Sequence, residues 1–483
     1  MGLVVASGNP ICILVMVWPP SRRHRTRLWR TYSTAVNAPG PAANTRVTDD
    51  MEQRGTSGTA PAQIKSAVLA SRAFASELFD QLRRDGLDEP GVSRDPYGPG
   101  EQRAHGTCAA VAEGMGLAID RDAAANLYMT LPGTDPSAKR IVIGSHLDSV
   151  PHGGNFDGAA GVVAGLVAIQ ALRRLGVSLP HDVTVMGIRA EESIWFQVSY
   201  IGSRAALGTL PEGSLEVRRI DTGRTLAEHI AECGGDPDRV RSGSRYFDPA
   251  RLHAFLELHI EQAPSLVEAG RSVGIGTGIP GNFRYPDAWI EGSNDHVGLP
   301  RRFRRDAAMA GAEFAMALDR MWEEYDSAGI PMACTIGRFH TDPKQHGLTI
   351  VPGAFHFSLD VRAYDETVLD ELRRRVDAII ARIEQNRGVR FHRGVTAHAA
   401  VGPVDPGIKA GLTRGAAALG IETIDLGSPA SHDAAAFAAC GVKMGLIFVR
   451  NSNGSHNPNE AMTIEDFLDG ATILTEWLVT RSI

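Results

Sequence analysis

The spacing of apolar residues predicts a parallel β-sheet with a buried helix packed on it. Short runs rich in β-branched residues have the length and composition of buried parallel strands. Four such runs are Ile141–Ile143, Val183–Met186, Ala254–Leu258 and Met444–Val449. Between the first two lies Ala159–Leu175, which is apolar on nearly every side, as expected for a helix buried on a sheet. Strand, helix and strand in this order form a βαβ unit, so the fold class is α/β with a mostly parallel sheet.

A different pattern occupies the middle of the chain. Ahead of the parallel strands, the sequence predicts an amphipathic helix from Ile64 to Leu82 and a second, short helix near Thr107–Met115. From about residue 270 to 385 the order of elements changes, and the parallel-sheet pattern then resumes. The stretches are strand-like at Asp287–Glu291, Met332–Arg338 and Ala354–Arg362, and helical at Asp306–Trp322 and Asp365–Gln385. We therefore expect a main domain over residues 61–269 and 386–483, with an α+β lid inserted at 270–385.

Residues 1–60 lack the periodicity of packed elements and differ from the rest in charge. No Asp or Glu precedes Asp49, whereas six arginines do, and the apolar run Ile11–Trp18 lies ahead of them. This order is the reverse of that in a secretory signal, and the run is too short to span a bilayer. An Arg-rich, acid-free start fits a mitochondrial transit peptide, and an upstream extension ahead of Met51 fits equally well. We interpret residues 1–60 as a disordered or targeting extension.

Charge and cysteine content narrow the range of partners. The 483 residues carry a formal charge of −7 without a long basic run, which argues against nucleic acid as a partner. Five dispersed cysteines with no CxxC pair indicate reduced thiols inside the cell rather than a disulfide framework. We expect a cytoplasmic protein, or a mitochondrial one if the N-terminus is a transit peptide. Its expected partner is a small-molecule substrate, without nucleic acid or membrane.

Side chains that can bind metals follow the predicted strands. In open α/β sheets, ligands bind just beyond the carboxyl ends of the strands. Five candidates lie at such ends or at the start of the buried helix: His146, Asp157, Glu192, His259 and His456. Taken singly, each has a structural alternative, because a strand-end His is more often structural and an Asp before a helix is often its N-cap. Five coincidences at one edge of one sheet favour a metal site.

The types of these side chains indicate two-metal hydrolysis. Imidazole and carboxylate ligands without thiolate suit Zn, Mn, Co or Ni, and a carboxylate can bridge two ions. Two ions together activate water and polarise a scissile carbonyl. Asp148, two residues after His146, is placed to accept the other N–H of that imidazole. The adjacent Glu191 and Glu192 suggest that one carboxylate binds metal while the other stays free as a general base.

The assembled motifs resemble the zinc-dependent aminoacylase and carboxypeptidase superfamily. Within it, the chain is similar to the branch of N-carbamoyl-L-amino acid hydrolases, β-ureidopropionases and allantoate or ureidoglycolate amidohydrolases. The matching stretches, over roughly residues 65–483, are GSHLDSVPHGGNFDGAAGV, AEES followed by GSRAALG, LELHIEQ, DHVGLPRRFRRDA, SHDAAAFA and SHNPNE. The resemblance implies a catalytic α/β domain with two divalent ions per subunit. It also implies an inserted lid that forms a homodimer.

The resemblance further implies roles for individual residues. One metal ion would be held by His146 and His259, the other by Glu192 and His456, with Asp157 as the bridge. Glu191 would be the general base. His296, in Asp-His-Val-Gly, would reach into the partner subunit's site and stabilise the oxyanion. Without the resemblance, His296 would be interpreted as a surface histidine.

Substrate contacts are implied at Gln262, Arg362 and His432. Arg362 falls on the polar face of its predicted strand, where a guanidinium could hold a substrate carboxylate or form an ordinary ion pair. His432 could equally be a residue beside a helix cap at Ser431. The chain departs from the family at Thr349, which replaces a substrate-binding Asn, and Thr offers one hydroxyl where Asn offers an acceptor and an NH₂ donor. It departs again after His296, where Val-Gly-Leu-Pro-Arg replaces Ala-Gly-Thr-Thr-Pro.

These observations lead to one main hypothesis and two alternatives. The main hypothesis is hydrolysis of an N-carbamoyl amino acid to the amino acid, carbon dioxide and ammonia. The first alternative is the same machinery acting on an N-acyl amino acid or a dipeptide. The second is a binding protein on a decayed hydrolase fold, against which the complete ligand set and Glu191 argue.

Overall fold

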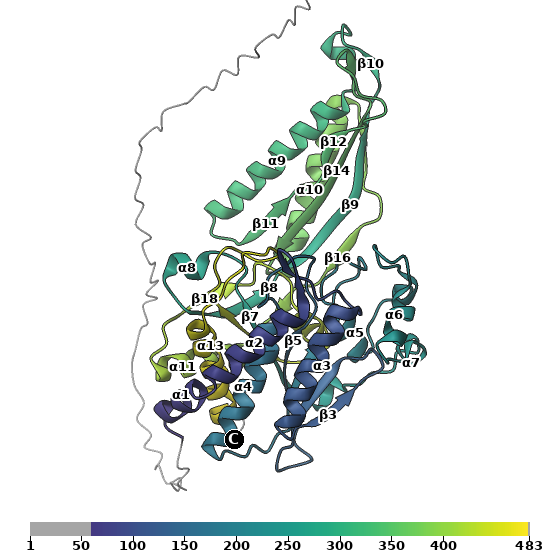
Figure 1. Cartoon of the computed structure of the whole chain (residues 1–483). Helices are drawn as coiled ribbons and strands as arrows, with labels where there is room; N and C mark the ends of the chain where they lie inside the picture. The colour runs from purple at the N-terminus through teal and green to yellow at the C-terminus, as the bar shows by residue number, and fades with distance from the viewer. Residues whose placement is uncertain (1–58, 482–483) are drawn as a thin grey trace, which may run out of the picture. The chain divides into compact units, whose positions relative to one another are not determined.

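The structure is a computed structural model that describes residues 59–481. Its larger sheet has nine strands in the order β17-β8-β19-β7-β5-β6-β4-β3, with β18 beside β8 (Figure 1). The strands are β3 (Ala118–Arg121), β4 (Leu127–Leu131), β5 (Arg140–His146), β6 (Val183–Ile188), β7 (Leu252–Ile260), β8 (Val273–Ile279), β17 (Gly402–Pro403), β18 (Thr423–Gly427) and β19 (Met444–Val449). The four central strands β19, β7, β5 and β6 are mutually parallel, which confirms the predicted α/β fold class.

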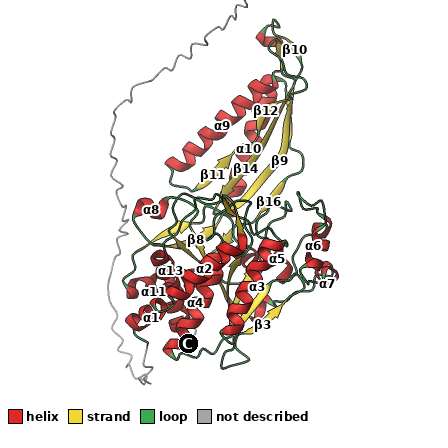
Figure 2. Ribbon diagram, viewed as in Figure 1, coloured by secondary structure: helices red, strands yellow, loops and turns green. Residues whose placement is uncertain are grey.

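Helices accompany this sheet (Figure 2). They are α1 (Pro61–Leu69), α2 (Arg72–Gly86), α3 (Pro99–Gly114), α4 (Ala159–Leu175), α5 (Ile201–Ala206), α6 (Leu226–Glu232), α7 (Pro237–Arg241), α8 (Ser265–Ala269), α11 (Pro406–Leu419), α12 (Ala434–Ala439) and α13 (Ile464–Arg481). Of these, α3, α4, α11, α12 and α13 contact the strands of the sheet. The predicted buried helix is α4, which contacts β5, β6, β7 and α13. Its approach is close at Gly161, where a Cβ atom would stand 2.5 Å from the carbonyl oxygen of Leu258. The apolar composition of α4 therefore fixes it directly behind the strands that carry the site.

The inserted segment has its own sheet and its own hydrophobic core. Its six-stranded sheet has the order β11-β14-β9-β15, with β12 on β14 and β16 on β9. The elements are β9 (Gly281–Glu291), β10 (Asp295–His296), α9 (Ala307–Ser327), β11 (Met332–Thr335), β12 (Phe339–Thr341), β13 (Ile350–Val351), β14 (Ala354–Ala363), α10 (Glu366–Arg387), β15 (Arg390–His392) and β16 (Ala397–Ala399). Burial alternates strictly along β14, and its apolar side chains join the core formed with α9 and α10. The opposite face of this lid sheet is polar.

Two boundaries differ from the sequence expectation. The lid was predicted at 270–385; strand β8 belongs to the nine-stranded sheet, whereas β15 and β16 belong to the lid sheet, whose strands lie between Gly281 and Ala399. The reason is that β8 is the glycine-rich stretch Val-Gly-Ile-Gly-Thr-Gly-Ile, which has little side-chain patterning to identify it. The helix expected over residues 64–82 is two helices, α1 and α2, separated at Ala70 and Ser71. The short helix expected at Thr107 begins earlier, at Pro99.

The structure bears in part on the predictions about residues 1–60 and about a membrane. The interpretation of residues 1–60 as an extension falls almost wholly outside the described residues. Within residues 59–481, no helix is long and apolar enough to cross a membrane.

Candidate active site

The carboxyl ends of the central parallel strands bring the five candidate ligands together. His146 is the last residue of β5, and His259 is the penultimate residue of β7. Glu192 follows β6 in the chain, and His456 lies in the loop after β19. Asp157 stands two residues before α4. Parallel strands end at one edge of a sheet, so residues far apart in the sequence meet there.

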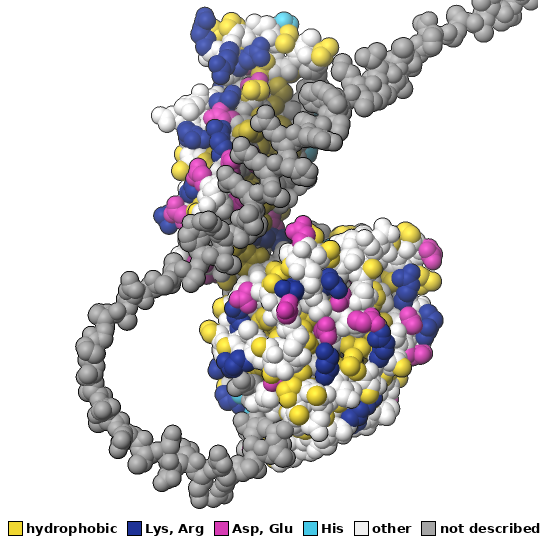
Figure 3. All heavy atoms as spheres, turned by 90° about the vertical axis from the view of Figure 1, so that its left-hand side faces the viewer, with side chains coloured by type: hydrophobic (Ala, Val, Ile, Leu, Met, Phe, Trp, Pro, Cys, Tyr) yellow, Lys and Arg dark blue, Asp and Glu magenta, His cyan; other side chains and the backbone are white. Residues whose placement is uncertain are grey.

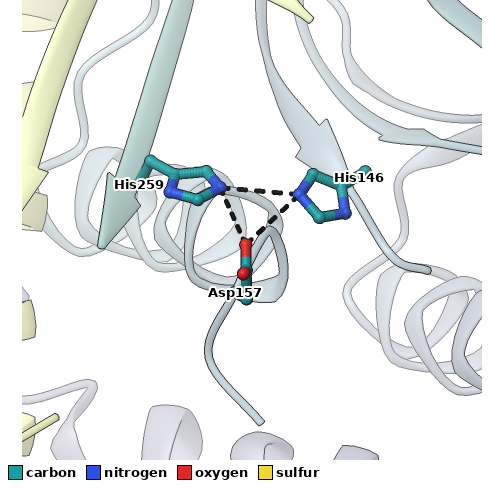
Figure 4. Close-up of side chains that lie close together, drawn as sticks. All are labelled: His146, Asp157 and His259. Atoms are coloured by element: carbon teal, nitrogen blue, oxygen red, sulfur yellow. Dashed lines mark hydrogen bonds and ion pairs between the residues drawn. The ribbon is translucent and has the colours of Figure 1, made fainter. Parts of the chain in front are cut away.

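His146, Asp157 and His259 form the first group (Figure 4). The Asp157 Oδ1 atom lies 3.5 Å from His146 Nε2 and 3.2 Å from His259 Nε2. The two Nε2 atoms are themselves 3.5 Å apart. The Nδ1 atoms point away, 3.0 Å from the carbonyl oxygen of Asp148 and 2.9 Å from that of Ile260. Because each Nδ1 can donate to a carbonyl, both Nε2 lone pairs are free to face a common point.

The second group is Asp157, Glu192 and His456. His456 Nε2 lies 3.1 Å from Glu192 Oε1 and 3.4 Å from Asp157 Oδ2. Asp157 therefore offers Oδ1 to the first group and Oδ2 to the second. One carboxylate with an oxygen in each of two ligand groups has the arrangement of a bridge between two cations.

The environment of the Asp157 carboxylate also suits a divalent cation. Asp157 Oδ1 is buried and accepts no hydrogen bond from any residue the structure describes. A buried carboxylate oxygen without a donor is costly unless a cation faces it. Burial alone would raise the pKa of Asp157, but the three neighbouring imidazoles hold it well below its usual range. Histidine nitrogens and carboxylate oxygens without thiolate are the donor set of Zn, Mn, Co or Ni, so these residues can hold divalent metal.

Asp148 has further contacts besides the expected one with His146. The sequence predicted that its carboxylate would accept the N–H of His146, but Nδ1 is closer to the Asp148 carbonyl than to the carboxylate, at 3.0 against 3.4 Å. The Asp148 carboxylate also accepts the backbone N–H groups of Glu191 and Glu192, each at 3.0 Å. It therefore fixes the turn that presents both glutamates.

Glu191 is half-buried and its carboxylate has no hydrogen-bond partner among the described residues. Burial and the charges of Glu192 and Asp433 raise its pKa well above the usual range, although His146 opposes the shift. A carboxylate that is free, close to the two ligand groups and raised in pKa has the properties of a general base.

A cavity of about 170 Å³ opens onto this constellation. Its lining residues are Asp157, Glu191, Glu192, Ser193, Ser199, His259, Gln262, Arg284, Arg362, Ala430, Ser431, His432 and His456. Three of the predicted substrate contacts are among them. Gln262 donates to Asp157 Oδ2 at 2.9 Å, and His432 is buried with its ring 4.3 Å from that of His259. Burial and the neighbouring His259 lower the pKa of His432 well below its usual range, so its imidazole is neutral.

His296 and Thr349 do not line this cavity. His296 is exposed on β10, which pairs with β13, and Val297 N–H donates to the Thr349 carbonyl at 2.9 Å. Strand β10 follows the far end of β9, whose 11 residues extend roughly 35 Å from the start of the lid. The two residues thus lie together at the tip of the lid and away from the site of their own chain.

The sequence analysis missed Glu460, which supports the bridging residue from behind. Glu460 Oε1 accepts the N–H groups of Phe156 and Asp157, at 2.9 and 3.3 Å. Ser455 Oγ lies 2.7 Å from both Glu460 Oε2 and Asp157 Oδ2, yet it has one proton to donate. Burial and the charge of Asp157 raise the pKa of Glu460 to about 7, so Glu460 can supply the second proton. Its signal was present in SHNPNE, but a loop glutamate has no periodicity to mark it.

We expect removal of this support to weaken metal binding. Glu460→Ala deletes three hydrogen bonds around Asp157 and should lower metal affinity about 10–100-fold, the usual effect of losing a residue that orients a ligand. Glu460→Gln should be nearly neutral, because its carbonyl can still accept from the backbone while its NH₂ donates to Ser455. Metal retained after dialysis against graded chelator measures both. Equal loss in the two variants would contradict the hydrogen-bond assignment.

Comparison with known proteins gives matches over most of the chain. The sequence model of peptidase family M20/M25/M40 matches residues 142–480. An N-carbamoyl-L-amino acid amidohydrolase from Geobacillus stearothermophilus is 36% identical over 395 residues, which are 81% of this chain and 94% of that protein. A probable allantoate deiminase from Oryza sativa subsp. japonica is 29% identical over 424 residues, which cover 81% of this chain and 85% of that protein.

Solved structures show the same architecture. A hydantoinase/carbamoylase family amidase from Burkholderia ambifaria superposes with a TM-score of 0.73 at 26% identity. The alignment covers 87% of this chain and 98% of that one. The similarity therefore extends over both the parallel-sheet domain and the lid.

Proposed function

The chain belongs to the peptidase family M20/M25/M40, and from this premise we propose that it is a two-metal amidohydrolase acting on N-carbamoyl amino acids. The products would be the amino acid, carbon dioxide and ammonia. The observation that carries the proposal is the placement of Asp157, whose two oxygens face two separate ligand groups. The relatives named for N-carbamoyl substrates support the choice of scissile group.

The residues of the chain divide the work of hydrolysis. His146, His259, Glu192 and His456 would hold two divalent ions with Asp157 between them. The ions would polarise the scissile carbonyl and make water a stronger acid. Glu191 would take the proton from the attacking water and pass it to the leaving nitrogen. These two transfers need a carboxylate that is not a ligand, and the Glu191 carboxylate is free.

Three residues would position the substrate. Arg362 lines the cavity and presents guanidinium N–H groups suited to a carboxylate. Gln262, already bound to Asp157, and the neutral His432 would contact the ureido group. The position of Arg362 on the polar face of β14 supports this role, since its side chain lies opposite the lid core.

We also propose a homodimer in which each lid tip completes the partner subunit's site. His296 and Thr349 lie at the tip, away from the cavity of their own chain. Basic side chains gather at the upper end of Figure 3, and exposed Arg301 and Arg302 follow His296 in the chain, which suits an approach to an acidic site. Exposed Met309 and Met316 are seven residues apart on α9, so they share one helix face that a second lid could cover.

The metal requirement tests the central claim. Purified protein should carry close to two divalent ions per chain, lose activity in chelator, and regain it when Zn, Mn, Co or Ni is returned, because without a cation the buried Asp157 Oδ1 has no hydrogen-bond donor among the described residues. Metal analysis by mass spectrometry and an activity assay measure the two effects. Full activity in metal-free protein would exclude the mechanism.

The alternative is an amidase for N-acyl amino acids or dipeptides. Thr349 favours it, since Thr offers a single hydroxyl where an Asn amide offers a carbonyl acceptor and a separate NH₂ donor to a ureido group. Parallel assays of N-carbamoyl and N-acetyl derivatives of the same amino acid decide between them. Ready cleavage of the acetyl form with none of the carbamoyl form would overturn our choice.

A further inference from the structure

Apart from the candidate ligands, Glu191, Gln262 and His432, the cavity lining is polar as well. The remaining lining residues are Ser193, Ser199, Arg284, Arg362, Ala430 and Ser431, and Ala430 is the only apolar residue in the whole lining. A hydrophobic substrate side chain would find more polar than apolar surface to contact there. Hydroxyl and guanidinium groups instead offer hydrogen-bond donors, which suit a substrate side chain that accepts them.

Arg284 reaches this region from the lid, next to Arg362. On β9, Arg284 pairs directly with Asp360 of β14, and its neighbours Phe283 and Tyr285 point into the lid core. Arg284 therefore lies on the polar face of the lid sheet, as Asp360 and Arg362 do. Its Nε donates to Asp360 Oδ2 at 2.8 Å.

Asp360 accepts a different number of hydrogen bonds from each of the two arginines. Arg362 donates to it from both Nε and Nη2, at 3.0 and 3.2 Å. Arg284 donates from Nε alone, and its Nη1 and Nη2 have no hydrogen-bond partner among residues 59–481. Asp360 thus holds the Arg284 side chain in place while leaving its terminal fork open. That fork, with two parallel N–H groups, can bind a further carboxylate in bidentate fashion.

The two guanidinium groups together offer more free N–H donors than one bidentate carboxylate uses. Under the proposed function, the α-carboxylate of an N-carbamoyl amino acid would bind Arg362. The fork of Arg284 would then remain in a cavity from which substrate has displaced water. A site with a buried donor left unpaired discriminates strongly against the ligand that leaves it so.

We propose that Arg284 is a specificity-determining residue that selects substrates with a second carboxylate on the side chain, such as N-carbamoyl-L-aspartate or N-carbamoyl-L-glutamate. This inference rests on the proposed function for the position of the α-carboxylate. Charge favours it, because Arg284 and Arg362 both line the cavity and share a single aspartate, Asp360, which is not among the lining residues. The cavity of about 170 Å³ suits a small diacid.

A panel of six compounds tests the inference separately from the proposed function. They are the N-carbamoyl and the N-acetyl derivatives of L-aspartate, L-asparagine and L-leucine. Within one series, kcat/KM for aspartate should exceed that for its neutral isostere asparagine, and that for leucine, by at least about tenfold. An equal or better rate for asparagine or leucine overturns the inference. Comparison between the two series tests the ureido proposal instead.

The outcomes are distinct. Acidic preference in the acetyl series alone supports the role of Arg284 and overturns the proposed function. Turnover of carbamoyl compounds without acidic preference overturns the role of Arg284 alone. No turnover of any of the six overturns both.

Variants connect the preference to Arg284. Arg284→Gln should lower kcat/KM for the aspartate derivative about 10–100-fold and change that for asparagine by less than about threefold. Arg284→Lys, which keeps the ion pair with Asp360 as a point charge, should retain part of the preference. Arg338→Gln is the matched control, since Arg338 is a lid arginine that pairs with Asp287 and lies outside the cavity lining. If both substrates fall equally in Arg284→Gln and Arg284→Lys does not restore the difference, Arg284 is structural and the inference fails.

Discussion

Replacement of Glu191 by Gln is expected to lower kcat about 10²–10⁴-fold while the protein keeps its metal and its fold. The amide cannot take a proton from water, yet it is close in shape to the carboxylate. The Glu191 carboxylate has no hydrogen bond to lose among the described residues, and the backbone N–H that Asp148 accepts is unchanged. Steady-state kinetics with metal analysis on the same sample measures the effect.

Glu192→Gln is the matched control, because the two residues are adjacent and Asp148 holds both backbones alike. Glu192 Oε1 faces His456, so its loss should lower metal content as well as rate. Loss of metal from Glu191→Gln, with full retention in Glu192→Gln, would mean that ligand and base are exchanged.

The positions of the candidate metal ligands at the edge of the sheet were predictable because they depend on two strong local signals. Buried parallel strands are apolar and short, and the residue that follows each strand must lie at the carboxyl edge of the sheet. For this reason, the positions of His146 and His259 could be predicted without knowledge of side-chain contacts. The motifs that contain these residues also indicated the superfamily, and the match of the peptidase family M20/M25/M40 model to residues 142–480 confirms it.

The contacts of residues that act across strands or through loops could not be predicted from the sequence. Arg284 was missed because only the end of β9, Asp287–Glu291, showed a strand pattern, whereas its partner Asp360 is set by the register of β9 against β14. The Asp148 carboxylate was assigned to the nearest histidine in sequence, but the turn after β6 also brings two backbone N–H groups to it. Such contacts depend on how separate elements pack, which periodicity does not encode.

The lid illustrates the same division. Alternation along Ala354–Arg362 predicted its polar and apolar faces, and the burial pattern of β14 confirms them. Neither the sequence alternation nor the burial pattern of β14 indicates whether the lid tip acts on the active site of its own chain or on that of a partner subunit. The position of His296 on β10, outside the cavity lining of its own chain, leaves that question to an experiment on mixed dimers.

His296→Ala and Glu191→Gln homodimers should each be nearly inactive, and dimers that contain one chain of each should recover activity. Loss of an oxyanion donor costs about 10²–10³ in kcat, and loss of the base costs a comparable factor. In the mixed dimer, the site with intact Glu191 receives His296 from the Glu191→Gln partner. That site is complete, whereas the other lacks both groups.

The expected amount of recovery follows from twofold symmetry. Random exchange makes half of the dimers mixed, and each has one complete site of two, so activity should reach about a quarter of the unmodified protein. A mixture of Glu191→Gln with Glu192→Gln is the matched control, because these residues line the same cavity and each site of that dimer lacks one of them. Differently tagged chains, purified through both tags, show that exchange has occurred. Failure to recover in such dimers would mean that His296 serves its own subunit or has no catalytic role, and the tip of the lid would then need another explanation.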